Sequence, residues 1–310
     1  MSDHKEAKSF SRFGYIMVAA GAAIGLGNIW KFPYLAYGDG GGAFVLIYIV
    51  ICILLGHPIV QAEQAVGRRG RASAAASYGV IHPKWRFVGV INIVCTFLID
   101  IYYLVVSGWV LKYFVTYVVS GDFGKDKQAY FDNYISSTTQ PLIYSLIIIA
   151  IIVFFLFFGI TNIVEKASKV IMPMLAVLLL VCGIYALIVV PGAVDGLKYY
   201  FVPDFSQFGM QQFADACMQV CFSVGIGWGI FTTLGASMNK DANLKADAWW
   251  VDICDTFIAL LAGFVIIPTV VGTGSEMSSG PSLVFVAMTQ IFETLPGGRI
   301  IGIFFFASLI

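Results

Sequence analysis

Long runs of apolar residues constrain this chain more than any other feature of its sequence. A helix needs about 20 predominantly apolar residues to cross the roughly 30 Å hydrocarbon core of a bilayer. Runs that qualify lie near residues 13–37, 43–66, 87–118, 142–160, 170–190, 212–237 and 248–273, and another opens at Ile300. The sequence therefore predicts an all-α, polytopic membrane protein with seven spans and the start of an eighth. We expect one integral membrane domain over residues 1–310.

The composition excludes a water-soluble domain. Hydrophobic residues make up 59% of the chain and charged residues 12%, whereas about 25% of residues are charged in a typical soluble domain. The 18 basic residues balance the 18 acidic ones, so no basic surface indicates binding to nucleic acid. We expect the lipid bilayer as the surroundings of the chain and no nucleic-acid partner.

The positions of the basic residues predict the orientation in the membrane. Most of them fall between spans on the side of the N-terminus: Lys5, Lys8, Arg12, Arg68, Arg69, Arg71, Lys84, Arg86, Lys166, Lys169, Lys240 and Lys245. Cytoplasmic loops carry an excess of Lys and Arg. We therefore expect a multi-pass protein of the cell membrane with a cytoplasmic N-terminus. The external loop between the third and fourth runs is short and lacks a cysteine pair, which is compatible with a bacterial inner membrane.

The stretch 275–298 is too polar at its start to cross the membrane. Its centre is nevertheless apolar, with Leu283, Val284, Phe285 and Val286 in a row. We predict an external loop that folds back into the protein and acts as a lid.

Two spans contain glycine clusters at mid-depth, over residues 21–28 and 222–229. Each glycine costs about 1 kcal/mol of helix propensity relative to alanine. Packing of helices through small residues such as Gly21 and Gly25 is the alternative explanation. Asn28 and Ser223 lie at the same depth and favour open backbone, which survives in a membrane only inside protein or beside a cavity. Interrupted helices at corresponding positions one and six indicate a five-plus-five inverted repeat with a binding site at the midplane.

Specific motifs give the chain a resemblance to a known family. The stretch 25–34 reads GLGNIWKFPY, and GGGAF follows at 40–44. Pro58, Glu63 and Gly67-Arg68 then close the second span, and GPSLVF stands at 280–285 in the lid. These motifs are similar to those of the neurotransmitter:sodium symporters, in the bacterial amino-acid transporter branch. The resemblance implies a transporter with sodium ions as coupled ions, and no enzyme activity.

The resemblance also implies a substrate site between the broken helices. The amides of Leu26 and Gly27 and the Tyr103 hydroxyl would hold a carboxylate, and carbonyls of Ala23, Phe222 and Ser223 an ammonium group. The side-chain pocket would be lined by Ile99, Phe222, Gly225 and Trp228. Relatives that carry amines have an aspartate where this chain has Gly25, so the substrate should bring its own carboxylate. We expect a small neutral amino acid with a bulky apolar or aromatic side chain.

Two sodium sites follow from the same resemblance. The first would use the Ala23 carbonyl, Asn28, Ser223, Asp255 and the substrate carboxylate. The second would use carbonyls of Gly21 and Ile24 together with oxygens from the eighth span. A fixed charge at Asp255, where chloride-dependent relatives have asparagine, predicts transport that needs no chloride.

The remaining positions would serve gating and support. Phe222 and Tyr103 would close over the substrate, and Lys31 matches a basic residue of the outer gate whose acidic partner lies in a later span of the relatives. Glu63, Tyr48 and Gln219 would hold opened backbone and neighbouring polar groups.

Two other functions stay open on the sequence alone. The family has eleven or twelve spans, so this chain could be a fragment of a transporter or a non-transporting partner; a homo-oligomer is also possible. Seven complete spans allow a seven-helix receptor, although the basic residues oppose its external N-terminus.

Overall fold

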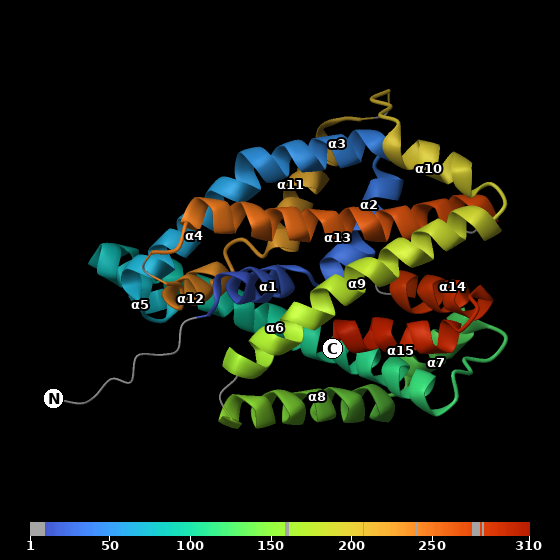
Figure 1. Ribbon diagram of the computed structural model, residues 1–310, viewed down its shortest axis with the longest axis horizontal. Coiled ribbons are helices and arrows are strands. Elements are labelled where there is room, and N and C mark those ends of the chain that lie inside the picture. Colours follow the sequence, from blue (N-terminus) through green and yellow to red (C-terminus); the bar gives the residue numbers. More distant parts are fainter. Residues whose placement is uncertain (1–9, 159–160, 207, 240, 275–279, 281) are drawn as a thin grey trace.

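The computed structural model describes residues 10–158, 161–206, 208–239, 241–274, 280 and 282–310. Its long helices run broadly along one axis (Figure 1). The α-helices are α1 Arg12–Ala23, α2 Phe32–Gly38, α3 Gly42–Ile51, α4 His57–Gly70, α5 Ala74–Ile81, α6 Arg86–Val119, α7 Lys127–Ser136, α8 Thr139–Phe158, α9 Thr161–Val189, α10 Ala193–Phe201, α11 Met210–Val224, α12 Ile230–Ala236, α13 Leu244–Thr273, α14 Thr289–Thr294 and α15 Gly298–Leu309. Single π-helical turns occupy Gly27–Lys31, Cys52–Gly56 and Leu283–Met288, and a 3-10 turn occupies Pro83–Trp85.

The apolar runs form helices of membrane-spanning length. Within the described residues, four helices are long and apolar enough to cross a bilayer: Gly42–Gly70, Pro83–Val119, Ile163–Val189 and Leu244–Gly272. The number rises to six if two bent pairs each count as one span, Arg12–Ala23 with Gly27–Gly38 and Lys127–Ser136 with Thr139–Phe155. The sixth predicted span, over residues 212–237, is not in this set. It consists of two short helices, α11 and α12, and the five residues between them are not helical.

The first helix is interrupted where the glycine cluster predicted it. Helix α1 ends at Ala23, and Ile24 has an extended backbone with φ −66° and ψ 104°. Helical structure resumes as the π-helical turn Gly27–Lys31, and the two halves meet at an angle of 58°. Gly21 lies before the break and faces Met172 of α9 at ordinary packing distance, so close helix packing accounts for this one glycine.

The second interruption, between α11 and α12, depends on left-handed glycines. Gly225, Gly227 and Gly229 have φ of 73°, 80° and 69°. Side chains other than glycine rarely adopt this region, so the alternating glycines set where the helix opens. The break covers residues 225–229, and the helix continues through Phe222 and Ser223. Both predicted interruptions are confirmed.

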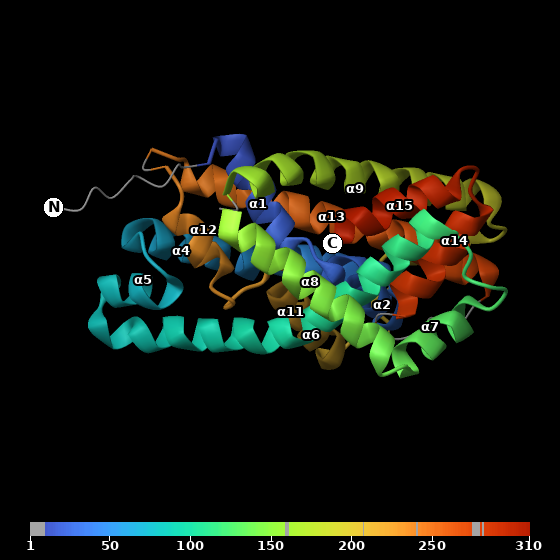
Figure 2. The ribbon, with the colours of Figure 1, turned by 90° about the horizontal axis from the view of Figure 1, so that it is seen from below.

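Helix α13 lies at the centre and α6 at the edge. Within the apolar part of each, 61% of the α13 residues are buried but only 11% of the α6 residues. Helices α1, α4, α9 and α10 pack against α13, whereas α6 runs along the lower margin in Figure 2. Both helix breaks therefore open beside the most buried of the four long apolar helices.

Candidate functional site

The two broken helices meet at a buried cluster of three polar side chains. The Asn28 amide nitrogen donates to Asp255 Oδ1 at 2.7 Å and to Ser223 Oγ at 2.9 Å. The Ser223 hydroxyl donates to the other carboxylate oxygen of Asp255 at 2.8 Å. All three residues are at most 2% exposed. The structure thus brings together three residues that were predicted for the first sodium site, from the π-helical turn after the first break, the end of α11 and α13.

The oxygen atoms of this cluster suit a hard alkali cation. Such cations prefer carboxylate, carbonyl and hydroxyl oxygens. Asn28 Oδ1 accepts a hydrogen bond from the Gly25 amide at 3.1 Å, and an amide oxygen has a second lone pair to offer. The Ala23 carbonyl lies 3.9 Å from the place of a Cβ on Gly25, at the edge of the same cluster. The donor set therefore fits sodium.

Two further predicted residues support the cluster. The Tyr48 hydroxyl donates to Ser223 Oγ at 3.2 Å, and Gln219 Nε2 donates to the Gly27 carbonyl at 3.2 Å. Tyr48 and Gln219 are completely buried. Gln219 thus adds a second hydrogen bond to a carbonyl that already accepts from the Phe32 amide within the π-helical turn.

The second break is held by side chains from α4 and α6. Glu63 Oε1 accepts from the Gly227 amide at 2.8 Å, at a position predicted for it. The sequence analysis missed Asn92 and Thr96. With its amide nitrogen turned toward the break, Asn92 donates to the Gly227 carbonyl at 3.1 Å. The Thr96 hydroxyl donates to the Trp228 carbonyl. Two polar residues four apart in an apolar run share one helix face, and this signal could have revealed them.

Aromatic rings surround the gap between the two breaks. Phe222 and Trp228 form an edge-to-face pair with centroids 5.4 Å apart, and Tyr103 approaches Trp228 at 6.4 Å. The Tyr103 hydroxyl would lie 3.3 Å from a Cβ on Gly25. Ile99 is half-buried on α6, one helical turn before Tyr103. Gly225 has no side chain, and a Cβ there would lie 3.6 Å from the Trp228 ring, so the residues predicted to line the side-chain pocket are mainly apolar and carry no fixed charge.

Leu26 and Gly27 begin the helix after the first break. Leu26 has helical φ and ψ and no side-chain cap, so amides at this helix start point toward the gap with positive partial charge. A Cβ on Gly27 would lie 2.7 Å from Phe222 Cε1. Only glycine leaves room for the Phe222 ring in this position.

Lys31 lies at the end of the same π-helical turn. Its Nζ stands 4.3 Å from the centroid of the Phe222 ring, a cation–π geometry. Asp215, on α11 and therefore earlier in the chain than the predicted partner, is an acidic group that acts electrostatically on Lys31. The sequence analysis did not consider Asp215.

The two residues predicted for the second sodium site line one cavity. Gly21 and Ile24 share a cavity of about 350 Å³ with Met172 of α9 and with Ser308 of α15. The Ser308 hydroxyl donates to the Phe305 carbonyl at 2.6 Å. A hydroxyl oxygen of the eighth span therefore lines the same cavity as the first break.

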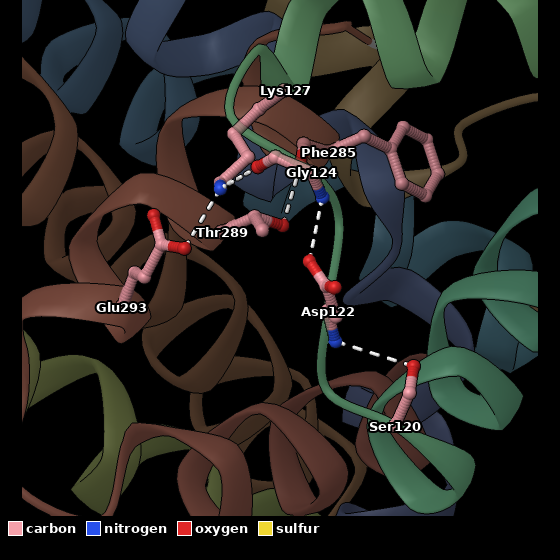
Figure 3. Close-up of polar contacts among 7 residues, drawn as sticks. All are labelled: Ser120, Asp122, Gly124, Lys127, Phe285, Thr289 and Glu293. Carbon is pink, nitrogen blue, oxygen red and sulfur yellow. Dashed lines mark hydrogen bonds and ion pairs between the residues drawn. The ribbon is translucent and has the colours of Figure 1, made fainter.

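The stretch predicted as a lid contains buried helix in its described part. Phe285 packs against the rings of Trp109, Tyr113 and Phe131, with centroids 6.1, 4.8 and 5.3 Å away. Figure 3 shows Lys127 from the start of α7 between the Gly124 carbonyl and Glu293 of α14, with Nζ 2.7 Å from Oε1. The segment thus folds back against α6 and α7. Residues 275–279 and 281 lie outside the described part, and the lid role stays a prediction.

Comparison with known proteins places the chain among transporters. The sequence profile of the sodium:neurotransmitter symporter family matches residues 7–121 and 131–310. A protein of Haemophilus influenzae described as an uncharacterised sodium-dependent transporter is 33% identical over 97% of this chain and 69% of its own length. A Bacillus subtilis protein with the same description is 33% identical over 100% of this chain and 70% of its own.

A solved structure shares the fold. The crystal structure of MhsT in complex with L-phenylalanine has a TM-score of 0.91 and 35% sequence identity. The match covers 98% of this chain and 70% of MhsT. The predicted broken-helix transporter fold is confirmed by this match, and a seven-helix receptor is excluded.

Proposed function

The chain belongs to the sodium:neurotransmitter symporter family, and from this premise we propose that it serves sodium-coupled symport of a neutral amino acid with an apolar or aromatic side chain. The observation that carries the proposal is the hydrogen-bonded cluster of Asn28, Ser223 and Asp255 at the meeting point of the two breaks. Sodium is a coupled substrate in this proposal and the amino acid is the cargo.

The absence of a fixed charge at position 25 supports an amino acid as substrate. Gly25 lies opposite the Tyr103 hydroxyl, next to the amides of Leu26 and Gly27. The Gly27 amide bonds to the Tyr103 hydroxyl here, and the same donors suit a substrate carboxylate at a helix start. The substrate carboxylate would then lie near the first sodium ion, which couples the binding of one to the other.

The rings of Phe222, Trp228 and Tyr103 support an apolar side chain. They present no charged group to the space that Gly225 leaves open. The structural relative MhsT is bound to L-phenylalanine, which agrees with a bulky apolar cargo. Phe222 and Tyr103 would also form the gate that closes above the substrate.

Asp255 supports transport without chloride. Its carboxylate is buried beside Tyr48, Ser223 and Asn28, and an ionised group inside a membrane protein is by default functional. A permanent negative charge there would balance the sodium ion, so a bound anion is not needed. The second sodium ion would bind in the cavity lined by Gly21 and Ile24.

The membrane potential would supply part of the driving force. Moving one net charge through 100 mV releases roughly 2.3 kcal/mol. At about 1.4 kcal/mol per factor of ten, that sustains roughly a forty-fold gradient of a zwitterion. The distribution of basic residues supports a cytoplasmic N-terminus, and the bacterial relatives support a bacterial inner membrane.

Uptake into liposomes tests the proposal. The purified chain is reconstituted, and uptake of labelled tryptophan, leucine and alanine is measured with an inward gradient of sodium chloride, sodium gluconate or choline chloride. We expect uptake in both sodium media and preference for tryptophan or leucine over alanine. Equal uptake with choline would refute sodium symport, and uptake in sodium chloride alone would refute chloride independence.

Binding to the detergent-solubilised chain separates transport from recognition. Sodium-dependent binding of tryptophan without uptake would show that this chain recognises the substrate as a non-transporting partner or part of a transporter. A chain that shows neither binding nor uptake would contradict the proposed site itself.

A further inference from the structure

A second buried pair of titratable groups lies outside the proposed substrate and sodium sites. His57, the first residue of α4, has its Nδ1 2.7 Å from Oδ2 of Asp252 on α13. Their side chains are 8% and 7% exposed. Helices α4 and α13 pack side by side, as Figure 1 shows. This pair contributes nothing to the proposed symport so far described, although ionisable residues at membrane depth are expensive to keep.

The local backbone presents His57 to α13. The π-helical turn Cys52–Gly56 ends immediately before His57, and Pro58 follows it. An inserted turn of this kind rotates the residues after it and is frequent at functional sites. A straight α-helix over 42–70 would place position 57 on a different face.

The indole of Trp249 covers one face of the imidazole. The two ring centroids are 3.9 Å apart and the planes are 19° from parallel. Trp249 and Asp252 are three residues apart on α13, so they lie on one face and hold the imidazole from two sides. An indole face attracts a cation. The stacked Trp249 ring can therefore stabilise the protonated imidazole of His57, and it also packs against the neutral one.

The carboxylate of Asp252 is incompletely satisfied. Its Oδ1 is buried and has no hydrogen-bond partner within the described part of the chain. Buried carboxylates are costly without a counter-charge. A proton taken up by the pair supplies that charge: with an ionised Asp252 that accepts Nδ1–H at Oδ2, the added proton binds at Nε2 and the pair changes from net −1 to neutral.

Asp255 connects this pair with the proposed sodium site. Asp252 and Asp255 are three residues apart on α13, and their carboxylates interact electrostatically. Sodium beside Asp255 adds positive charge and so disfavours the proton on His57. The other groups that act on the pair are Lys245 near the start of α13 and the Cys52 thiol of the π-helical turn. Helix α12, which packs on α4, carries no titratable residue, and α5 carries only Tyr78.

We propose that the His57–Asp252 pair is a proton-binding site whose proton is released to water when sodium binds at Asp255. The linkage rests on the proposed sodium site, whereas proton binding rests on the His57–Asp252–Trp249 geometry alone. Linkage is reciprocal, so acidification must weaken sodium binding to the same extent as sodium weakens proton binding.

Fluorescence of the detergent-solubilised chain tests proton binding without sodium. A protonated imidazole quenches a stacked indole, so the Trp249 signal, isolated by subtracting the Trp249→Phe spectrum, should fall as the pH is lowered. We expect His57→Gln to abolish this titration, because glutamine bonds to Asp252 but takes up no proton. Asp252→Asn should move it to lower pH, and His82→Gln, at an exposed loop histidine, should leave it unchanged. A titration that survives in His57→Gln would overturn the proposal.

The same signal tests the linkage. Saturating sodium should move the midpoint down by about one pH unit, which is a tenfold loss of proton affinity, and Asp255→Asn should remove that shift while the titration itself remains. An unchanged midpoint, in a chain that sodium demonstrably stabilises against heat, would overturn the linkage but leave symport intact. A chain that sodium does not stabilise would contradict the proposed sodium site, and the titration without sodium would still decide whether His57 binds a proton.

Discussion

At the scale of single residues, glycine matters in this site where a neighbouring ring occupies the place of a side chain. Gly27 is the clearest case, because Phe222 Cε1 and Cδ1 would lie 2.7 and 2.8 Å from a Cβ there. Contacts under 3 Å require the ring to move. Phe222 also packs on Trp228 and lies below Lys31, so its displacement would disturb the gate and the pocket together.

We therefore expect Gly27→Ala to weaken amino-acid binding tenfold or more, about 1.4 kcal/mol, with little loss of sodium-independent stability. Equilibrium binding of labelled substrate to the solubilised protein measures the effect. Gly38→Ala is the matched control, since no atom lies within 4 Å of a Cβ there. Equal affinities for the two variants would contradict the placement of Phe222 over the site.

Asp255 carries the only full negative charge among the three clustered side chains. Asp255→Asn keeps the size of the side chain but removes that charge, so we expect the apparent sodium affinity to fall about tenfold, or about 1.4 kcal/mol. Added chloride should restore part of the affinity, because an anion then replaces the carboxylate. Sodium titrations of thermal stability in chloride and in gluconate measure both effects, with the surface variant Asp195→Asn as control. Unaltered sodium affinity would argue against Asp255 as a ligand.

At the scale of elements, the second break consists of alternate residues that are left-handed glycines, and side chains of neighbouring helices hydrogen-bond to its backbone. Gly227 has φ of 80°, and its amide donates to Glu63. Open space surrounds a Cβ at this position. Any effect of a substitution must therefore come from the backbone and not from a clash.

Gly124 offers a matched comparison in the loop between α6 and α7, with φ of 70° and equally open surroundings. Forcing a side chain into the left-handed region costs about 1–2 kcal/mol. We expect Gly227→Ala and Gly124→Ala to lower thermal stability by similar amounts, and only Gly227→Ala to weaken substrate binding. Comparable binding by both variants would show that the shape of the break is not needed for recognition.

At the scale of the whole molecule, a carboxyl group at the end of the broken first span adds a pH dependence to folding. Asp39 follows α2, and one of its carboxylate oxygens is buried without a hydrogen-bond partner in the described residues. Burial, with repulsion from Asp215, raises the pKa of Asp39 from 3.8 to about 6. The folded protein therefore holds this proton more tightly than the unfolded chain does.

This difference in proton affinity fixes the direction in which stability changes with pH. The contribution of Asp39 to stability is complete below about pH 4 and is lost as the pH rises through about 6. We expect Asp39→Asn to flatten the decline of thermal stability between these values. Asp204→Asn is the control of opposite sign, since hydrogen bonds from Ser206 lower the pKa of Asp204. If the thermal stability of Asp39→Asn declines as steeply with pH as that of the native protein, another group causes the decline.

The sequence by itself determined most of the spans and the two stretches in which helices open. The length of an apolar run and the helix propensity of glycine are local properties, so the stretches 21–28 and 222–229 were identifiable without coordinates, and the structure narrowed the second break to 225–229. Motifs also named Asn28, Ser223 and Asp255, which the structure brings into contact. Only the tertiary structure decided which other polar groups meet. The π-helical turn at Cys52–Gly56 turns His57 toward Asp252, 195 positions later, and packing of α6 brings Asn92 and Thr96 to the second break. Such contacts depend on the rotation and packing of whole helices, which no local pattern of residues specifies.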